Sequence, residues 1–184
     1  MVPTASPMIL LFAEIGRHRN EHQDSFIPTG QFLLGYLTVW TGFSVLATLT
    51  QWGLLTVALV SPAMESTSKA LGVLLLLGAG FYQFSPLKYA CLDHCRTPMG
   101  FFVTEWRGGS WGALRMGLKH GGYCLGCCWA LMGLLFAFGV MNLLWVASIS
   151  GFVLLEKITS GNQAVSRLGG LLFIGWAAWI AFGL

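Results

Sequence analysis

The chain has 184 residues, of which 55% are hydrophobic and only 9% are charged. Soluble domains carry roughly 25% charged residues, so this composition excludes an ordinary soluble globular domain. The net charge is +3, without a basic run or a separate basic domain, which argues against nucleic-acid binding. A lipid bilayer can surround the excess apolar surface if helices satisfy the backbone. We therefore expect a single integral membrane domain over residues 1–184.

Apolar stretches follow one another along the chain. A membrane-spanning helix needs about 20 mostly apolar residues. Short apolar sequence at the start of the chain precedes uncharged runs over 31–60 and 70–87, and a polar stretch follows over 88–119. Residues 120–155 then contain no Asp, Glu, Lys or Arg, and a last apolar run covers 168–184. The run over 120–155 is too long for one spanning helix and long enough for two.

The distribution of basic residues indicates how this long run is divided. Membrane proteins keep Lys and Arg on the cytoplasmic side. With a hairpin near 139–142, successive loops hold 2, 1, 5, 0 and 2 basic residues, and the richer loops all fall on one side. We therefore predict an all-α, polytopic transmembrane bundle of about six membrane segments. They are expected at 3–16, 31–58, 70–88, 119–138, 141–157 and 167–184, with loops 17–30, 88–119 and 157–167 in the cytoplasm.

All five cysteines occur in two short motifs, each where a predicted helix meets the cytoplasmic interface. The motifs are KYACLDHCR over 88–96 and KHGGYCLGCCW over 119–129. In a helix, the i, i+4 spacing of Cys91 and Cys95 places both sulfurs on one face, and the second motif repeats this spacing between a histidine and a cysteine. Cys124 and Cys127 form a C-x-x-C, whose two thiols can reach one small ion.

This combination of side chains predicts a site for a soft metal ion. Thiolate sulfur suits Cu(I) or Zn(II), and imidazole suits both, whereas no carboxylate cluster or oxygen-rich loop is present for harder ions. Cu(I) is the first choice and Zn(II) the second. The candidate ligands are Cys91, His94, Cys95, His120, Cys124, Cys127 and Cys128. The pair Gly121–Gly122 is expected to let the backbone bend, and Gly126 is expected to permit close approach.

The cysteines are also compatible with a packing, redox or structural role. Cysteine is often a small buried hydrophobe, and His94 lies in a charged stretch where it would simply be solvated. A C-x-x-C beside a membrane can pass disulfides to a quinone, but cytoplasmic thiols stay reduced. In a third alternative, the protein is a structural subunit of a larger membrane complex, and the cysteine cluster only locks two helices together. A metal hydrolase needs a general base, and Asp93 is the only acid near the cluster; an enzyme is therefore not the favoured interpretation.

The remaining polar residues have simpler expected roles. Glu156 and Lys157 are expected to form a local ion pair, and Gln83 is expected to hydrogen-bond between helices. Five basic residues are expected to orient the chain and to contact lipid headgroups; they are Lys88, Arg96, Arg107, Arg115 and Lys119.

The chain resembles a bacterial family of predicted metal-binding integral membrane proteins, some of which are linked to copper supply for tyrosinase-type copper oxidases. The matching stretches are PTASPMILLFA, PLKYACLDHCRTPMGFF, GALRMGLKHGGYCLGCCWALM and GVMNLLWVASISGFVLLEK, among which HGGYCLGCCW is specific. The family's histidine and cysteine positions fall on His120, Cys124, Cys127 and Cys128, with Cys91 and Cys95 in the preceding motif.

This resemblance implies a multi-pass protein of the bacterial inner membrane that acquires or delivers copper, as a transporter or a chaperone. Its implied partners are the lipid bilayer and a copper-dependent oxidase or metallochaperone. Family members usually carry another apolar segment before the PTASPM stretch, so we expect the natural protein to begin further upstream or to be truncated here.

Overall fold

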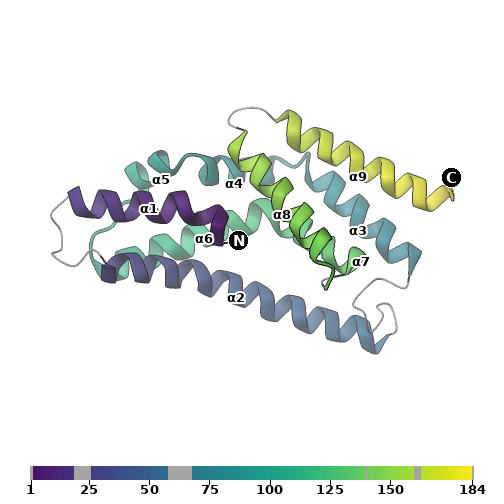
Figure 1. The fold of residues 1–184 in the computed structure, drawn as a ribbon, viewed down its shortest axis with the longest axis horizontal. Coiled ribbons are helices and arrows are strands. Elements are labelled where there is room, and N and C mark those ends of the chain that lie inside the picture. The colour runs from purple at the N-terminus through teal and green to yellow at the C-terminus, as the bar shows by residue number, and fades with distance from the viewer. Residues whose placement is uncertain (1, 19–25, 58–67, 140, 160–162, 184) are drawn as a thin grey trace. The chain divides into compact units, whose positions relative to one another are not determined.

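The computed structural model describes residues 2–18, 26–57, 68–139, 141–159 and 163–183. All regular structure in these residues is helical, which confirms the predicted all-α class (Figure 1). The helices are α1 (Val2–His18), α2 (Phe26–Thr56), α3 (Lys69–Tyr82), α4 (Pro86–Arg96), α5 (Pro98–Glu105), α6 (Gly109–Gly133), α7 (Leu135–Phe138), α8 (Leu143–Ile158) and α9 (Ala164–Phe182). Parts of the predicted loops 17–30 and 157–167, and most of the connection between the predicted segments 31–58 and 70–88, lie outside the described residues.

Three helical segments of the described chain are long and apolar enough to cross a membrane. They are Pro28–Thr56, Gly109–Phe138 and Ala164–Phe182. A fourth is added if α3 and α4, which meet at a bend of 65°, count as one broken span. The helices α1 and α8 have 17 and 16 residues, which is short for a span. The fold is therefore all-α with several membrane-compatible helices.

The bend between α3 and α4 follows from the sequence Phe84-Ser85-Pro86. Proline lacks the backbone N–H that would continue a helix, and it is well suited to the first position of a new one. The hydroxyl of Ser85 accepts a hydrogen bond from the Leu87 backbone N–H at 3.2 Å, as N-terminal capping residues do. The predicted single segment over 70–88 is accordingly two helices.

The polar stretch over 88–119 is not the loop that the sequence predicts. It is occupied by the end of α4, by α5 and by the first part of α6. Its Lys and Arg side chains do not oppose this outcome, because both residues favour helix formation. Short connections at Thr97 and around Gly108 separate the three helices.

The chain divides into two compact units. The first unit comprises Met1–Ser44 and Ala90–Cys127. Its core is built from buried side chains of α1, α2, α5 and α6, namely Met8, Phe12, Phe32, Phe101, Phe102, Ala113 and Met116. Phe12 stacks on Phe32 with the ring centroids 4.9 Å apart. These contacts give the first unit a largely aromatic core.

Within the first unit, the backbones of α2 and α6 touch each other. A Cβ atom added at Gly117 would lie 2.0 Å from the carbonyl oxygen of Phe32, and one added at Gly35 would lie 2.3 Å from that of Leu114. No larger residue fits at either position without moving a helix. Small residues that let helices approach in this way are typical of packing inside membranes.

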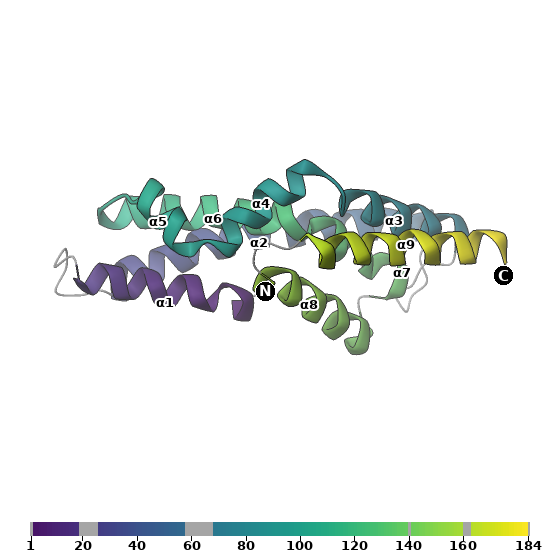
Figure 2. The same ribbon diagram turned by 90° about the horizontal axis from the view of Figure 1, so that it is seen from above.

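The second unit comprises Val45–Tyr89 and Cys128–Leu184. Helices α3 and α9 run side by side in it (Figures 1 and 2). A Cβ at Gly80 would lie 3.1 Å from the carbonyl oxygen of Gly170, and one at Gly170 would lie 3.0 Å from that of Gly80. The two glycines therefore form a reciprocal point of contact between the helices.

A buried ion pair lies in the second unit. The Nζ atom of Lys88 donates to Glu156 Oε1 at 2.7 Å and to Oε2 at 2.9 Å, and it also donates to Gln83 Oε1. All three side chains are buried. The expected hydrogen bond of Gln83 is confirmed, but the expected headgroup contact of Lys88 is wrong, because Lys88 is buried and pairs with Glu156. Burying either charge alone would be costly, so each stabilises the other.

Replacing Lys88 alone should destabilise the protein strongly. In Lys88→Met the carboxylate of Glu156 stays buried without its ammonium partner, which typically costs about 3–5 kcal/mol. The double variant Lys88→Met/Glu156→Met should recover a large part of this loss, because apolar replacement of a whole buried pair is often tolerated. The measurement is the unfolding free energy of detergent-solubilised protein in a reversible denaturant titration.

The matched control is Glu14→Gln, which removes one partner of an exposed ion pair with Arg17. Its effect should stay below about 1 kcal/mol. A Lys88→Met protein as stable as the wild type, or a double variant that loses more than the single one, would contradict the buried pairing.

Candidate metal-binding site

The seven predicted ligands lie on two helices. Helix α4 carries Cys91, His94 and Cys95, and α6 carries His120, Cys124, Cys127 and Cys128. Six of them belong to the first unit, whereas Cys128, the last in sequence, is counted with the second. All five cysteines lie in the described part of the chain, and none of them forms a disulfide.

Cys91 of α4 packs directly on the backbone of α6. A Cβ atom at Gly126 would lie 2.7 Å from Cys91 Sγ, so only glycine at this position leaves room for the thiol. Cys91 is also close enough to Cys127 for a charge on one sulfur to act on the other. The close approach that the sequence predicts at Gly126 is confirmed, and it brings one thiol from each motif together.

Two further contacts join the motifs. The ring of His94 stacks on Tyr123, with the centroids 4.3 Å apart and an angle of 19° between the planes. One residue further along α4, Cys95 packs against a buried group that contains Tyr36 and Cys124. Three candidate ligands of α4 therefore face the same part of α6.

The two thiols of the C-x-x-C are held differently. Cys124 Sγ lies 3.5 Å from the hydroxyl oxygen of Tyr36 on α2, within hydrogen-bonding distance for sulfur. Cys127 Sγ donates to the backbone carbonyl oxygen of Cys124 at 3.1 Å. Both side chains are buried. Neither cysteine motif points to Tyr36, although a tyrosine in an uncharged helix needs a partner for its hydroxyl group.

His120 lies one helical turn before Cys124 and is surrounded by aromatic rings. Its ring centroid lies 6.1 Å from that of Phe32, 5.9 Å from that of Tyr36 and 5.8 Å from that of Phe101. The imidazole is buried. His120 and Cys124 therefore share Tyr36 as a neighbour, and the rings around them exclude water from this side of α6.

Helix α6 passes through Gly121 and Gly122 without interruption, so the bend expected at this pair is not present. A Cβ at Gly121 would lie 3.1 Å from the side chain of Val39, whereas one at Gly122 would meet nothing within 4 Å. The first glycine allows close packing on α2, and the second has no neighbour of this kind.

The structure brings the predicted residues together in small sets. Cys91 lies near Cys127, and His120 and Cys124 both lie beside Tyr36. Among the described residues, no group of three or more His, Cys, Asp or Glu side chains is close enough to hold a metal ion. The single site of seven ligands stays a prediction.

The amino-acid sequence matches the PpoB2 copper chaperone family over residues 1–180. The chain belongs to this family. Comparison with curated proteins found no match, and comparison with solved structures found none either. Because the match covers both cysteine motifs and the helices that carry them, it confirms the copper-supply family that the sequence resembles.

For a copper chaperone, the exposure of the thiols is informative. Cys91 and Cys95 on α4 are half-buried, whereas Cys124, Cys127 and Cys128 on α6 are buried. The family's activity requires a metal to reach the protein and to leave it again. The α4 thiols are therefore the ones that a ligand from outside meets more readily.

Proposed function

We propose that the protein binds Cu(I) through its clustered thiols within the membrane and hands the ion to a copper-dependent oxidase. The observation that carries this proposal is the contact between the two cysteine motifs, with Cys91 against Gly126 and near Cys127. In a copper chaperone family member, thiols from two helices meeting in this way are the best candidates for holding the cargo.

The arrangement favours Cu(I) over Zn(II). A pair of soft sulfur ligands is sufficient for Cu(I), whereas structural Zn(II) sites take four ligands. The described residues offer neighbouring thiols and an imidazole, but no preformed group of three or more ligands. Zn(II) therefore remains the second choice. The proposed ligands are Cys91, Cys95, His120, Cys124, Cys127 and Cys128, with His94 at the exposed edge.

Transfer would proceed by ligand exchange. A thiolate from a donor or acceptor coordinates Cu(I) before a resident thiolate leaves, so no electron is transferred and no energy source is needed. The half-buried thiols of Cys91 and Cys95 would take the ion first or release it last. The buried thiols of Cys124 and Cys127 would hold it away from water.

We place the protein in the bacterial inner membrane as one integral domain of about six segments, with the cysteine motifs facing the cytoplasm. The distribution of basic residues supports this orientation, and three apolar helices of sufficient length are compatible with it. The partner is a copper-dependent oxidase or a metallochaperone that reaches the cytoplasmic face.

Purified protein should contain copper. We expect about one copper ion per chain after purification under reducing conditions, measured by elemental analysis, because a buried thiol cluster retains a soft ion. The variant Cys124→Ser/Cys127→Ser should lose most of it. The control is Met141→Leu, which removes an exposed sulfur outside the cluster and should leave the copper content unchanged. Equal copper in the cysteine variant and the wild type would rule out this site.

The cysteines of α4 should be accessible only from the cytoplasm. A membrane-impermeant thiol reagent should leave Cys91 and Cys95 unlabelled in intact cells and should label them after permeabilisation. A Met141→Cys substitution in a cysteine-free background is the control, because Met141 lies in the predicted outer hairpin and should be labelled in intact cells. Labelling of Cys91 or Cys95 from outside would reverse the proposed orientation.

Deletion of the gene should lower the activity of the copper-dependent oxidase, and excess copper in the medium should restore it. Complementation with wild type or Met141→Leu should succeed, and complementation with Cys124→Ser/Cys127→Ser should fail. Lost activity that copper does not restore would favour a thiol redox role or a structural subunit instead. Unchanged oxidase activity together with unchanged cellular copper would refute delivery.

A further inference from the structure

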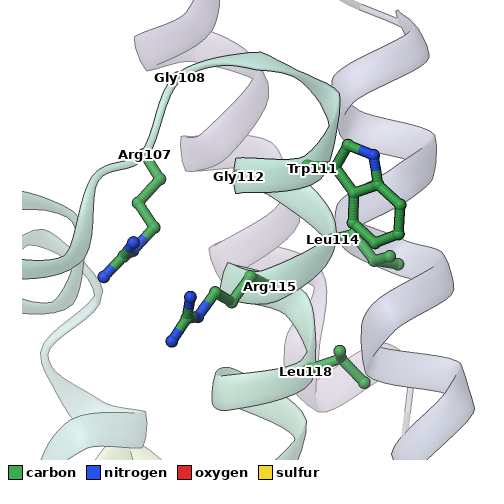
Figure 3. Close-up of a pocket in the computed structure, with 7 residues that line it drawn as sticks. All are labelled: Arg107, Gly108, Trp111, Gly112, Leu114, Arg115 and Leu118. Carbon is green, nitrogen blue, oxygen red and sulfur yellow. The ribbon is translucent and has the colours of Figure 1, made fainter.

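A pocket of about 530 Å³ lies in the first unit beside the start of α6. Figure 3 shows that it has two unlike walls. The side chains of Arg107 and Arg115 extend to one side of the helix, and their guanidinium groups point the same way. Trp111, Leu114 and Leu118 form the other side. The pocket therefore combines two positive charges with an apolar surface.

The two guanidinium groups are available to a ligand. Both arginines are exposed, and neither forms an ion pair or a hydrogen bond with a residue that the structure describes. Glu105, the carboxylate just before Arg107, accepts a hydrogen bond from Lys119 Nζ at 2.5 Å. This hydrogen bond, more than the charge of Arg107, lowers the pKa of the Glu105 carboxyl. The negative charge of Glu105 is thus compensated mainly by Lys119.

The length of the helix places the pocket at the depth of the lipid headgroups, a step that rests on the proposed membrane location. The segment Gly109–Phe138 has 30 residues, which corresponds to roughly 45 Å of helix. The hydrocarbon core is only about 30 Å thick. Residues 120–138 carry no Asp, Glu, Lys or Arg and match that core by themselves. Residues 109–119 then extend into the headgroup layer.

The two walls fit the two parts of a phospholipid at this depth. Guanidinium groups bind phosphate oxygens through paired N–H donors. Trp111 is 83% exposed, and tryptophan favours the membrane–water interface at the level of the headgroups. We propose that this pocket binds an anionic phospholipid, with Arg107 and Arg115 on the phosphate, Trp111 beside the headgroup and Leu118 at the start of the acyl chains.

The test is lipid binding to the full chain, measured by native mass spectrometry from detergent micelles. Dioleoylphosphatidylglycerol should bind more tightly than dioleoylphosphatidylcholine. The variant Arg107→Gln/Arg115→Gln should weaken phosphatidylglycerol binding by about 30-fold, because two basic groups near the anionic headgroup are removed. The matched control, Arg17→Gln/Arg167→Gln, removes two exposed arginines elsewhere and should have little effect.

Three outcomes would overturn the proposal. Equal losses in the two double variants would mean that binding follows total charge rather than the pocket. Equal binding of the two lipids would exclude recognition of the anionic headgroup. Displacement of the lipid by millimolar inorganic phosphate would assign the site to free phosphate. Thermal unfolding checks that each variant is folded. The copper content of each variant should equal that of the wild type, and this measurement separates lipid binding from the proposed copper function.

Discussion

Direct contact between helix backbones is the constraint on which the first unit depends. Gly35 and Gly117 let α2 and α6 touch, and this contact fixes how the two helices are aligned. Further along α6, Gly121 lies against the carbonyl of Tyr36, and the next residue on the same face, Cys124, meets the Tyr36 hydroxyl. In the proposed membrane location, where water is absent, tight packing of small residues would replace the hydrophobic effect as the force between these helices.

The second unit depends on a different interaction, which stabilises a buried charge in apolar surroundings. Lys88 is satisfied by Gln83 from the end of α3 and by Glu156 from α8. The pairing also changes the meaning of the charge pattern. Lys88 does not meet headgroups and the Arg96 side chain is only 5% exposed, so the stretch 88–119 offers three surface basic residues instead of five. It remains the richest of the predicted loops, and the predicted orientation does not depend on Lys88.

The sequence predicts the helices of the uncharged runs, because an apolar run is a local signal, but the break before Pro86 is missed, since the apolar run continues across it. It cannot predict the pairing of Lys88 with Glu156, since the two residues are 68 positions apart and each has a plausible role at an interface. The helices within 88–119 are missed for a related reason. The charged residues of this stretch suggest a loop, and the packing of their apolar neighbours, such as Phe101 and Phe102, cannot be seen in the sequence.

The candidate site is predictable to a similar degree. The spacing of the cysteines and their common membrane depth indicate that the motifs meet, and Gly126 marks the contact. The role of Tyr36 has no motif, because the contact depends on the alignment of α2 with α6.

The hydrogen bond between Tyr36 and Cys124 has a consequence for the thermodynamics of loading. In the proposed function, copper binds the Cys124 thiolate, so the thiol proton must leave when the ion arrives. Before copper binds, either the Tyr36 hydroxyl or the Cys124 thiol can donate the hydrogen bond. Once the thiol proton has left, the Tyr36 hydroxyl can act only as the donor to sulfur. The proposed exchange of copper at this residue is thereby coupled to the movement of a proton, which would make the acidity of the surrounding compartment a determinant of how firmly the cargo is held.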